Sequence, residues 1–227
     1  MSLIIPCWRD GELVSRLLRR DVGQNETIVI LAMPDEGLVG RLRDLGATVI
    51  VSNEANRGHQ LALGAEAASG DVLVFHHADS EIEEGQVRAV VEVMGDSRIV
   101  GGAFHRKFDG RHPLFRWIEP VERWRALRFG ALFGDQSIFV RRSHYEAIGG
   151  FRNLPLMEDV EFSNRLRRSG RIALLDPPMT TSDRAHREGG AWRTSIRNGL
   201  FLLLFRCGVS PDRLHTWYYR RKEVESL

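Results

Sequence analysis

The stretch Asp71-Val-Leu-Val-Phe75, followed by His76-His-Ala-Asp-Ser80, decides how this chain folds. An apolar run of this length is typical of a buried strand, and here it ends in two histidines and a carboxylate. In open α/β sheets, ligands bind outside the carboxyl ends of the strands. The stretch therefore predicts a strand that delivers polar side chains to a binding site.

Strands and helices alternate on both sides of this stretch. The expected strands cover residues 2–5, 27–32, 47–51 and 71–75, and the expected helices cover residues 12–20, 36–45, 59–68 and 84–94. Four such alternations indicate an α/β fold with a doubly wound, mainly parallel sheet flanked by helices.

The second half is less regular. Strands are expected at residues 99–108, 137–141 and 171–175, and helices at residues 114–124, 158–168 and 192–206, before a basic tail. Since no linker or repeat divides the chain, we expect one domain with C-terminal helices. Residues 1–110 would form a donor-binding half and residues 111–227 an acceptor and catalytic half.

Composition limits the class of protein. The chain has 227 residues, of which 43% are hydrophobic, and this is ordinary globular composition. A net charge of +2 does not support nucleic acid as a partner. Cys7 and Cys207 give neither a disulfide framework nor a zinc spacing, so a reducing, cytoplasmic location is predicted. Met1 leads directly into a strand pattern, and no signal peptide is expected.

His77 and Asp79 are the first candidates for chemistry. A carboxylate at a strand end that faces a diphosphate can hold a hard divalent cation. The alternative is a turn in which Asp79 caps the next helix and His77 is satisfied in the core.

Two glycine motifs come next. Arg57-Gly-His-Gln60 places an arginine and a glycine at a helix start, which suits an anion. Gly134-Asp-Gln136 lies between an aromatic helix and a strand, where its polar side chains could face a cleft. A loop with a solvated arginine and a simple turn are the respective alternatives.

Glu158-Asp159 opens an expected helix. Asp159 shares a face with Phe162 and Leu166 and should point inward, where burial raises a carboxyl pKa toward that of a general base. Alternatively, both acids complement the helix dipole. His186 follows in a later loop, and its imidazole could be a further metal ligand that favours manganese over magnesium.

In their order, these features resemble the family 2 glycosyltransferases of the GT-A fold. They resemble more closely the small bacterial branch called the radical-SAM/selenodomain-associated transferase 2 group. The resemblance covers almost the whole chain. It rests on Ile4-Ile-Pro-Cys-Trp8, Arg57-Gly-His-Gln60, Gly70-Asp-Val-Leu-Val-Phe-His-His-Ala-Asp79, Gly134-Asp-Gln-Ser-Ile-Phe-Val-Arg-Arg142, Gly149-Gly-Phe151, Pro155-Leu-Met-Glu-Asp-Val-Glu161 and Gly208-Val-Ser-Pro211.

The resemblance implies a nucleotide-sugar donor, a divalent metal (Mn or Mg) and an acidic base that deprotonates an acceptor hydroxyl. Asp79 matches the last carboxylate of the family's DXD motif, with His77 at its first position. Asp159 matches the base, with Glu158 beside it. His186, which the resemblance does not assign, is kept as a further candidate metal ligand. The donor and nucleotide side would comprise Pro6, Asp10, Asp35, Arg57, His77 and Gln136.

Two stretches depart from the family pattern. Leu31-Ala-Met-Pro-Asp35 replaces an acidic, glycine-rich turn, and Arg9-Asp10 replaces an Asn-Glu pair. Two other readings therefore stay open. One is a nucleotidyltransferase, although the first strand lacks a following glycine-rich phosphate loop. The other is a degenerate nucleotide-binding or partner-binding module, which the intact Glu158-Asp159 pair opposes.

The apolar segment at residues 200–205 is too short to cross a bilayer, which takes about 20 residues. It and the Trp/Arg segment near residues 114–128 could form amphipathic surfaces for a lipid-linked acceptor or for peripheral contact with the inner membrane face. Packing on the sheet or in a homodimer interface is the favoured alternative. The sequence thus predicts a protein that is soluble without detergent.

Overall fold

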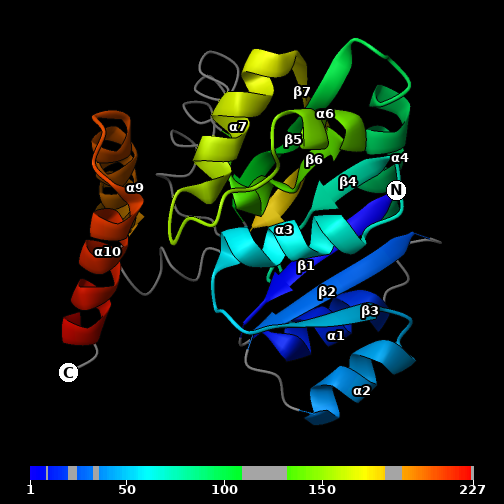
Figure 1. Ribbon diagram of the computed structural model, residues 1–227, viewed down its shortest axis with the longest axis horizontal. Coiled ribbons are helices and arrows are strands. Elements are labelled where there is room, and N and C mark those ends of the chain that lie inside the picture. The colour runs from blue at the N-terminus through cyan, green and yellow to red at the C-terminus, as the bar shows by residue number, and fades with distance from the viewer. Residues whose placement is uncertain (9, 20–24, 33–35, 109–131, 182–190, 226–227) are drawn as a thin grey trace.

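The computed structural model describes residues 1–8, 10–19, 25–32, 36–108, 132–181 and 191–225. Strands of these residues form one seven-stranded sheet in the order β3-β2-β1-β4-β6-β5-β7 (Figure 1). Their bounds are β1 Ser2–Cys7, β2 Glu26–Ala32, β3 Thr48–Ser52, β4 Val72–Phe75, β5 Ile99–Phe108, β6 Ile138–Arg141 and β7 Arg171–Thr181.

Helices connect and cover the strands. They are α1 Gly11–Arg19, α2 Glu36–Asp44, α3 Arg57–Ala67, α4 Glu84–Val93, the 3-10 turn η1 Gly134–Gln136, α6 Arg142–Ala147, α7 Glu158–Ser169, α9 Ala191–Arg206 and α10 Pro211–Glu225.

The sheet is mainly parallel because strand–helix units build its first half. β1 pairs in parallel with β2 and with β4, and β2 pairs in parallel with β3. β6 runs antiparallel between β4 and β5, whereas β5 and β7 are parallel to each other. The chain proceeds outward from β1 to β3 and then returns to place β4 on the other side of β1. The order thus reverses between β1 and β4, where α/β sheets bind ligands.

Both faces of the sheet are apolar, since strand side chains alternate between them. Leu3 and Ile5 pack on one face with residues of α1 and α4, while Ile4 packs on the other face with residues of α3 and α7. Burial on both faces explains why the strands read as continuous apolar runs rather than as alternating ones.

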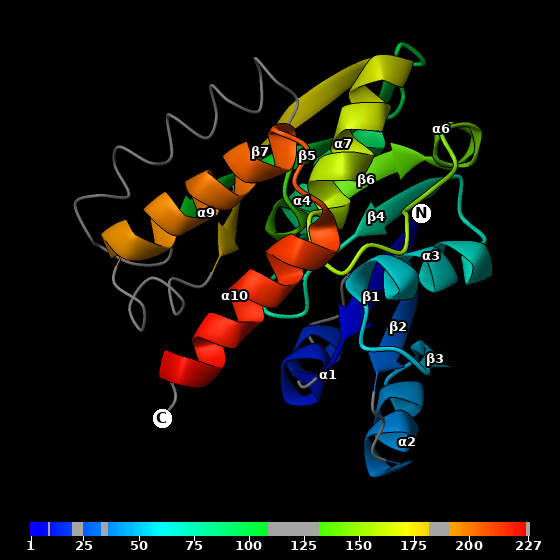
Figure 2. The same cartoon turned by 60° about the vertical axis from the view of Figure 1, so that its left-hand side comes forward.

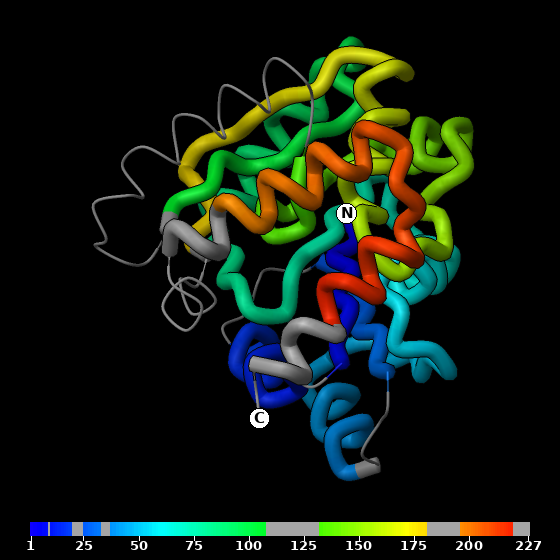
Figure 3. The backbone as a smooth tube through the Cα atoms, turned by 90° about the vertical axis from the view of Figure 1, so that its left-hand side faces the viewer, coloured from blue at the N-terminus to red at the C-terminus, as the bar shows by residue number. Residues whose placement is uncertain are grey.

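α9 and α10 stand apart from these layers. In Figure 1 they lie to one side of the sheet, and Figure 2 and Figure 3, which bring that side forward, show both helices in front of the sheet. No helix of the described residues is long and apolar enough to cross a membrane.

The structure confirms the expected α/β architecture and corrects several bounds. β1 continues through Pro6, which is possible because its pairing with β4 ends at Ile4 and needs no N–H beyond that point. β7 extends to Thr181, and the basic tail is helix α10. The helix expected near residues 114–124 lies outside the described residues.

Candidate functional site

The loop after β4 is held by His76, the first histidine of the pair. His76 is buried, and its Nε2 lies 2.9 Å from the carbonyl oxygen of Ser80, which can only accept. Nε2 therefore carries the proton, and Nδ1 accepts from the Ser137 hydroxyl at 2.7 Å. Burial lowers the pKa of His76 to about 4, so the imidazole is neutral near pH 7. This histidine orders the loop instead of reacting.

His77 and Asp79 are the residues that the loop presents outward. Their side chains are paired through His77 Nδ1 and Asp79 Oδ1, and they are 31% and 37% exposed. Burial opposes ionisation of Asp79, but the hydrogen bond and charge of His77, together with the Arg57 charge, leave the pKa of Asp79 below its usual value. The site therefore offers an ionised carboxylate beside an imidazole, both within reach of solvent.

The Arg57-Gly-His-Gln60 motif joins three parts of the fold at the start of α3. The Asn56 side chain caps the helix by accepting from the backbone N–H of His59 at 3.1 Å. Gln60 is buried and donates to the carbonyl oxygens of Cys7 and Ile30 at 3.1 and 2.8 Å, which links the ends of β1 and β2.

Gly58 allows a close approach between α3 and the loop before α7. A Cβ at this position would lie 2.3 Å from the carbonyl oxygen of Arg152. Because that oxygen belongs to the backbone, the clash could be removed only by moving the main chain. The glycine is therefore required by packing, and it brings Arg57 to the base of α7.

Arg57 forms the centre of the site. Its Nη1 lies 3.3 Å from Glu158 Oε1, and its guanidinium rests directly on Gly134, where a Cβ would lie 1.8 Å from Nη2. Arg57 Nε is buried and has no hydrogen-bond partner among the described residues. A buried donor without a partner is costly, and a bound anion would satisfy it.

The backbone conformation of the residue before α7 sets the direction of the two acidic side chains at the start of this helix. Met157, just before them, has φ of 65°, a left-handed conformation that non-glycine residues rarely adopt. Asp159 Oδ2 accepts from the Gly134 N–H at 2.8 Å, and Oδ1 accepts from the Val160 N–H at 2.7 Å. Asp159 is partly buried, whereas Phe162 and Leu166, with which it is expected to share a helix face, are fully buried.

Burial also shifts the pKa of both acids. It raises the pKa of Glu158 to about 7, with the charge of Asp159 adding to the rise and Arg57 opposing it. Burial raises the pKa of Asp159 as well, against the Arg57 charge and the two backbone N–H groups. Two carboxyl groups therefore share one cation, an arrangement that keeps a proton available near neutral pH.

Gln136 and Asp135 complete the turn that carries Gly134. Gln136 is buried, and its amide donates to the Phe104 carbonyl at 3.2 Å and accepts from the Phe133 N–H at 2.8 Å. Asp135 Oδ2 lies 2.5 Å from Arg106 Nη1. Both side chains thus serve to fix the turn, and Gln136 is engaged inside the protein rather than presented in a cleft.

Tyr219 of α10 is not among the residues selected from the sequence. It is 40% exposed. Burial raises its pKa, with the charges of Tyr218 and Glu158 adding to the rise and Arg57 opposing it. Glu158 and Arg57 are therefore among the charges that act on the Tyr219 hydroxyl.

Other predicted residues have simpler places. Pro6 and Asp10 lie at the end of β1 and just before α1, where the Asp10 carbonyl accepts from the first turn of the helix. Asp35 and His186 lie outside the described residues. Within the described ranges, no group of three or more His, Cys, Asp or Glu side chains is arranged to hold a metal.

Comparison with known proteins gives a family for this arrangement. The profile of glycosyl transferase family 2 matches residues 2–149. The search of curated protein sequences returned no match.

Several solved structures share the fold at low sequence identity. The mannosyltransferase PcManGT from Pyrobaculum calidifontis, in complex with GDP-Man and Mn²⁺, has a TM-score of 0.67 and 17% identity over 96% of this chain and 68% of that chain. S. aureus TarS in complex with UDP has a TM-score of 0.64 and 15% identity, over 80% of this chain and 60% of that chain.

A third structure is glucosyl-3-phosphoglycerate synthase from Mycobacterium tuberculosis, in complex with Mn²⁺, UDP-Glc and phosphoglyceric acid. Its TM-score is 0.59 at 17% identity, over 92% of this chain and 79% of that chain. The family match covers both β1 and β4, which flank the site, and the sheet matches those of these glycosyltransferases. The chain has the GT-A fold and belongs to glycosyl transferase family 2.

Proposed function

We propose that this protein transfers a sugar from a nucleoside-diphosphate donor to an acceptor hydroxyl, with Asp159 as the general base. One observation carries the proposal. The Asp159 carboxylate is fixed by the Gly134 N–H at 2.8 Å, in the same cluster as Arg57 and Glu158. Two of the similar structures are complexes with the nucleotide sugars GDP-Man and UDP-Glc, which supports a donor of that class.

The donor diphosphate is proposed to lie between Arg57 and the His77–Asp79 pair. Arg57 supplies a cationic fork with one buried N–H still unpaired, and guanidinium forks suit phosphate oxygens. Pro6 and Asp10, at the end of β1, are proposed to contact the nucleobase and ribose. Asp35 remains a predicted contact outside the described residues.

A divalent metal fits the His77–Asp79 pair by its donor chemistry. The pair offers a carboxylate oxygen and an imidazole nitrogen, which Mn²⁺ accepts together, whereas Mg²⁺ prefers oxygen alone. Diphosphate oxygens would complete the coordination, and His186 remains a predicted additional ligand. When bound, the metal would neutralise negative charge on the leaving diphosphate.

The proposed reaction uses Asp159 to take the acceptor proton. The acceptor oxygen forms a bond to the anomeric carbon, the bond from that carbon to the diphosphate oxygen breaks, and the diphosphate leaves with the electron pair. The Gly134 and Val160 N–H groups hold Asp159 in one orientation throughout. Glu158 pairs with Arg57 and keeps that cation directed at the site.

Calorimetric titration tests donor binding most directly. UDP, GDP, CDP and dTDP should each be titrated into the protein in the presence of Mn²⁺, of Mg²⁺ or of a chelator. The metals should be present at roughly millimolar concentration, which saturates weak metal sites. We expect one nucleotide to bind more tightly when a metal is present. Failure of all four to bind under every condition would remove the proposal and favour a degenerate module. A cytoplasmic location and a lipid-linked acceptor remain predictions.

A further inference from the structure

The outward face of α9 is apolar. Ile196, Leu200 and Leu203 follow each other at helical spacing and are 66%, 50% and 57% exposed. Leu202, on the other side of the helix, is only 6% exposed. The helix therefore packs on one side and offers a row of large aliphatic side chains to its surroundings on the other.

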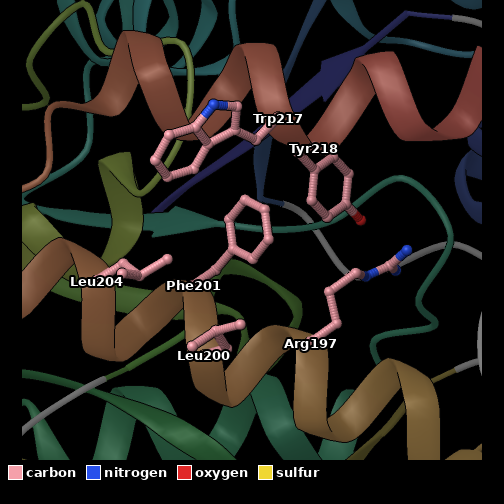
Figure 4. A pocket seen from close by; sticks show the side chains of 6 residues that line it. All are labelled: Arg197, Leu200, Phe201, Leu204, Trp217 and Tyr218. Carbon is pink, nitrogen blue, oxygen red and sulfur yellow. The ribbon is translucent and has the colours of Figure 1, made fainter.

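A groove of about 190 Å³ lies between α9 and α10 and shares Leu200 with this outward row (Figure 4). Leu200, Phe201 and Leu204 of α9 face Trp217 and Tyr218 of α10 across it. A water molecule takes only ~30 Å³ of liquid volume, so the groove is larger than a packing defect. Trp217 is 50% exposed, and tryptophan is a residue that favours the interface between water and lipid.

The cationic side chain of Arg197 lies at one end of the groove. The Arg197 guanidinium lies over the Tyr218 ring, with its central carbon 4.9 Å from the ring centroid. Arg197 Nε is buried and has no hydrogen-bond partner among the described residues. The groove thus has an apolar lining and, at one end, a cationic side chain with an unpaired N–H. An anionic amphiphile would complement both features.

Charge decides between the possible occupants of this face. Residues 191–225 contain seven Arg and Lys but only three Asp and Glu, which gives a net +4 in a chain whose total is +2. Two copies of so basic a segment would repel each other. A bilayer with anionic lipids offers apolar chains and negative charge together.

We propose that α9 and α10 dock this protein on the surface of a bilayer that contains anionic lipids. The row formed by Ile196, Leu200 and Leu203, with Trp217, enters the boundary between headgroups and acyl chains, and Arg197 pairs with a lipid phosphate. This docking goes beyond sugar transfer and does not depend on it.

Vesicle sedimentation tests this proposal with four variants of the full chain. Leu203→Ser removes one exposed apolar side chain, and Val91→Ser on α4 is its matched control because Val91 is 60% exposed. Arg197→Gln removes the groove cation, and Arg167→Gln removes an exposed charge from α7. Vesicles of phosphatidylcholine alone are compared with vesicles that also contain phosphatidylglycerol. Circular dichroism confirms that each variant folds.

We expect the parent to bind phosphatidylglycerol vesicles and not pure phosphatidylcholine. Arg197→Gln should lower the partition coefficient about fivefold, the usual worth of one basic residue at an anionic surface. Leu203→Ser should lower it about tenfold, as burial of a leucine predicts. The two controls should bind as the parent does, and high salt should weaken the binding.

Two results would overturn the proposal. One is equal binding, or none, to the two kinds of vesicle. The other is equal loss in the α9 variants and their matched controls. A stable dimer in sedimentation velocity that Leu203→Ser dissociates would instead show that a second copy covers this face.

Discussion

Arg57 Nη1 lies 3.3 Å from Glu158 Oε1 and thereby joins the first residue of α3 to the first residue of α7. Asp159 competes for the same cation, since Arg57 also opposes the rise in its pKa. One guanidinium can neutralise only one of the two carboxylates in this partly enclosed site. Protonation of a carboxyl group removes the second negative charge. The charge of the site therefore changes near neutral pH.

Glu158 should make folding stability depend on pH. Its pKa is about 7 in the folded chain, against 4.5 for an exposed glutamate. Between these values the folded chain keeps a proton that the unfolded chain has released, so stability falls as pH rises from 4.5 to about 7.

Relative to Glu158→Gln, the parent should lose on the order of 1–3 kcal/mol of unfolding free energy across that window. Urea unfolding at half-unit pH steps measures the loss. Glu92→Gln, at an exposed position of α4, is the control and should run parallel to the parent. Parallel curves for the parent and Glu158→Gln would contradict a raised pKa.

Gly134→Ala should weaken nucleotide binding although it removes no polar side chain. The new Cβ would lie 1.8 Å from Arg57 Nη2, so the guanidinium must move away. Arg57→Gln should weaken nucleoside-diphosphate binding by roughly tenfold or more, as for loss of a charge-assisted contact. Since both changes act on one guanidinium, the double variant should be little worse than either single one.

Gly85→Ala is the matched control, because a Cβ there meets nothing within 4 Å. Calorimetry with the preferred nucleoside diphosphate measures the affinities of the parent, the two single variants and the double variant, which form a double-mutant cycle. Additive losses would mean that Gly134 acts independently of Arg57.

Asp79→Ala should reduce nucleoside-diphosphate affinity only when Mn²⁺ or Mg²⁺ is present. The carboxylate is 37% exposed and its pKa is lowered, so it is ionised and accessible to a cation at neutral pH. Titrations with metal and with chelator separate the two contributions. Asp71→Ala removes an exposed carboxylate from the other end of β4 and should bind as the parent does. The metal role fails if Asp79→Ala and the parent respond equally to metal.

Asp159→Asn should lower turnover by roughly two to four orders of magnitude, the usual contribution of a general base. Donor affinity should stay near the parental value. Both carboxylate oxygens of Asp159 accept backbone N–H groups, and an amide has one oxygen, so we also expect a loss of about 1–3 kcal/mol in stability.

Sugar-transfer rates and thermal unfolding of the same preparations check both effects. Glu158→Gln distinguishes the two acids, because it should retain most of its turnover if Asp159 is the base. The reverse pattern would move the base to Glu158.

The sequence predicted the local elements well because their signals are local. β5 has the predicted bounds Ile99–Phe108, and the Asp159 side of α7 was identified from its spacing to Phe162 and Leu166. The sequence indicated His77 as the histidine of the site, but it did not show that His76 holds the loop. That depends on Ser137, which lies far along the chain and reaches His76 only through the pairing of β4 with β6.

The Arg57–Glu158 pair also depends on long-range packing. Gly58 and Gly134 look like ordinary turn glycines until the structure shows what their missing Cβ atoms would touch. α10 read as a basic tail because its apolar residues are few and its partner is another helix rather than the sheet. Amphipathic spacing reveals that a helix has two faces, but it does not reveal what each face meets.

The left-handed conformation of Met157 has a consequence for how this site can change. One backbone torsion sets the direction of both Glu158 and Asp159, although Met157 itself brings no reactive group. A β-branched residue there would resist the torsion and turn both carboxylates at once. Variants that bind and react poorly can therefore arise at a position that a search for reactive side chains would pass over.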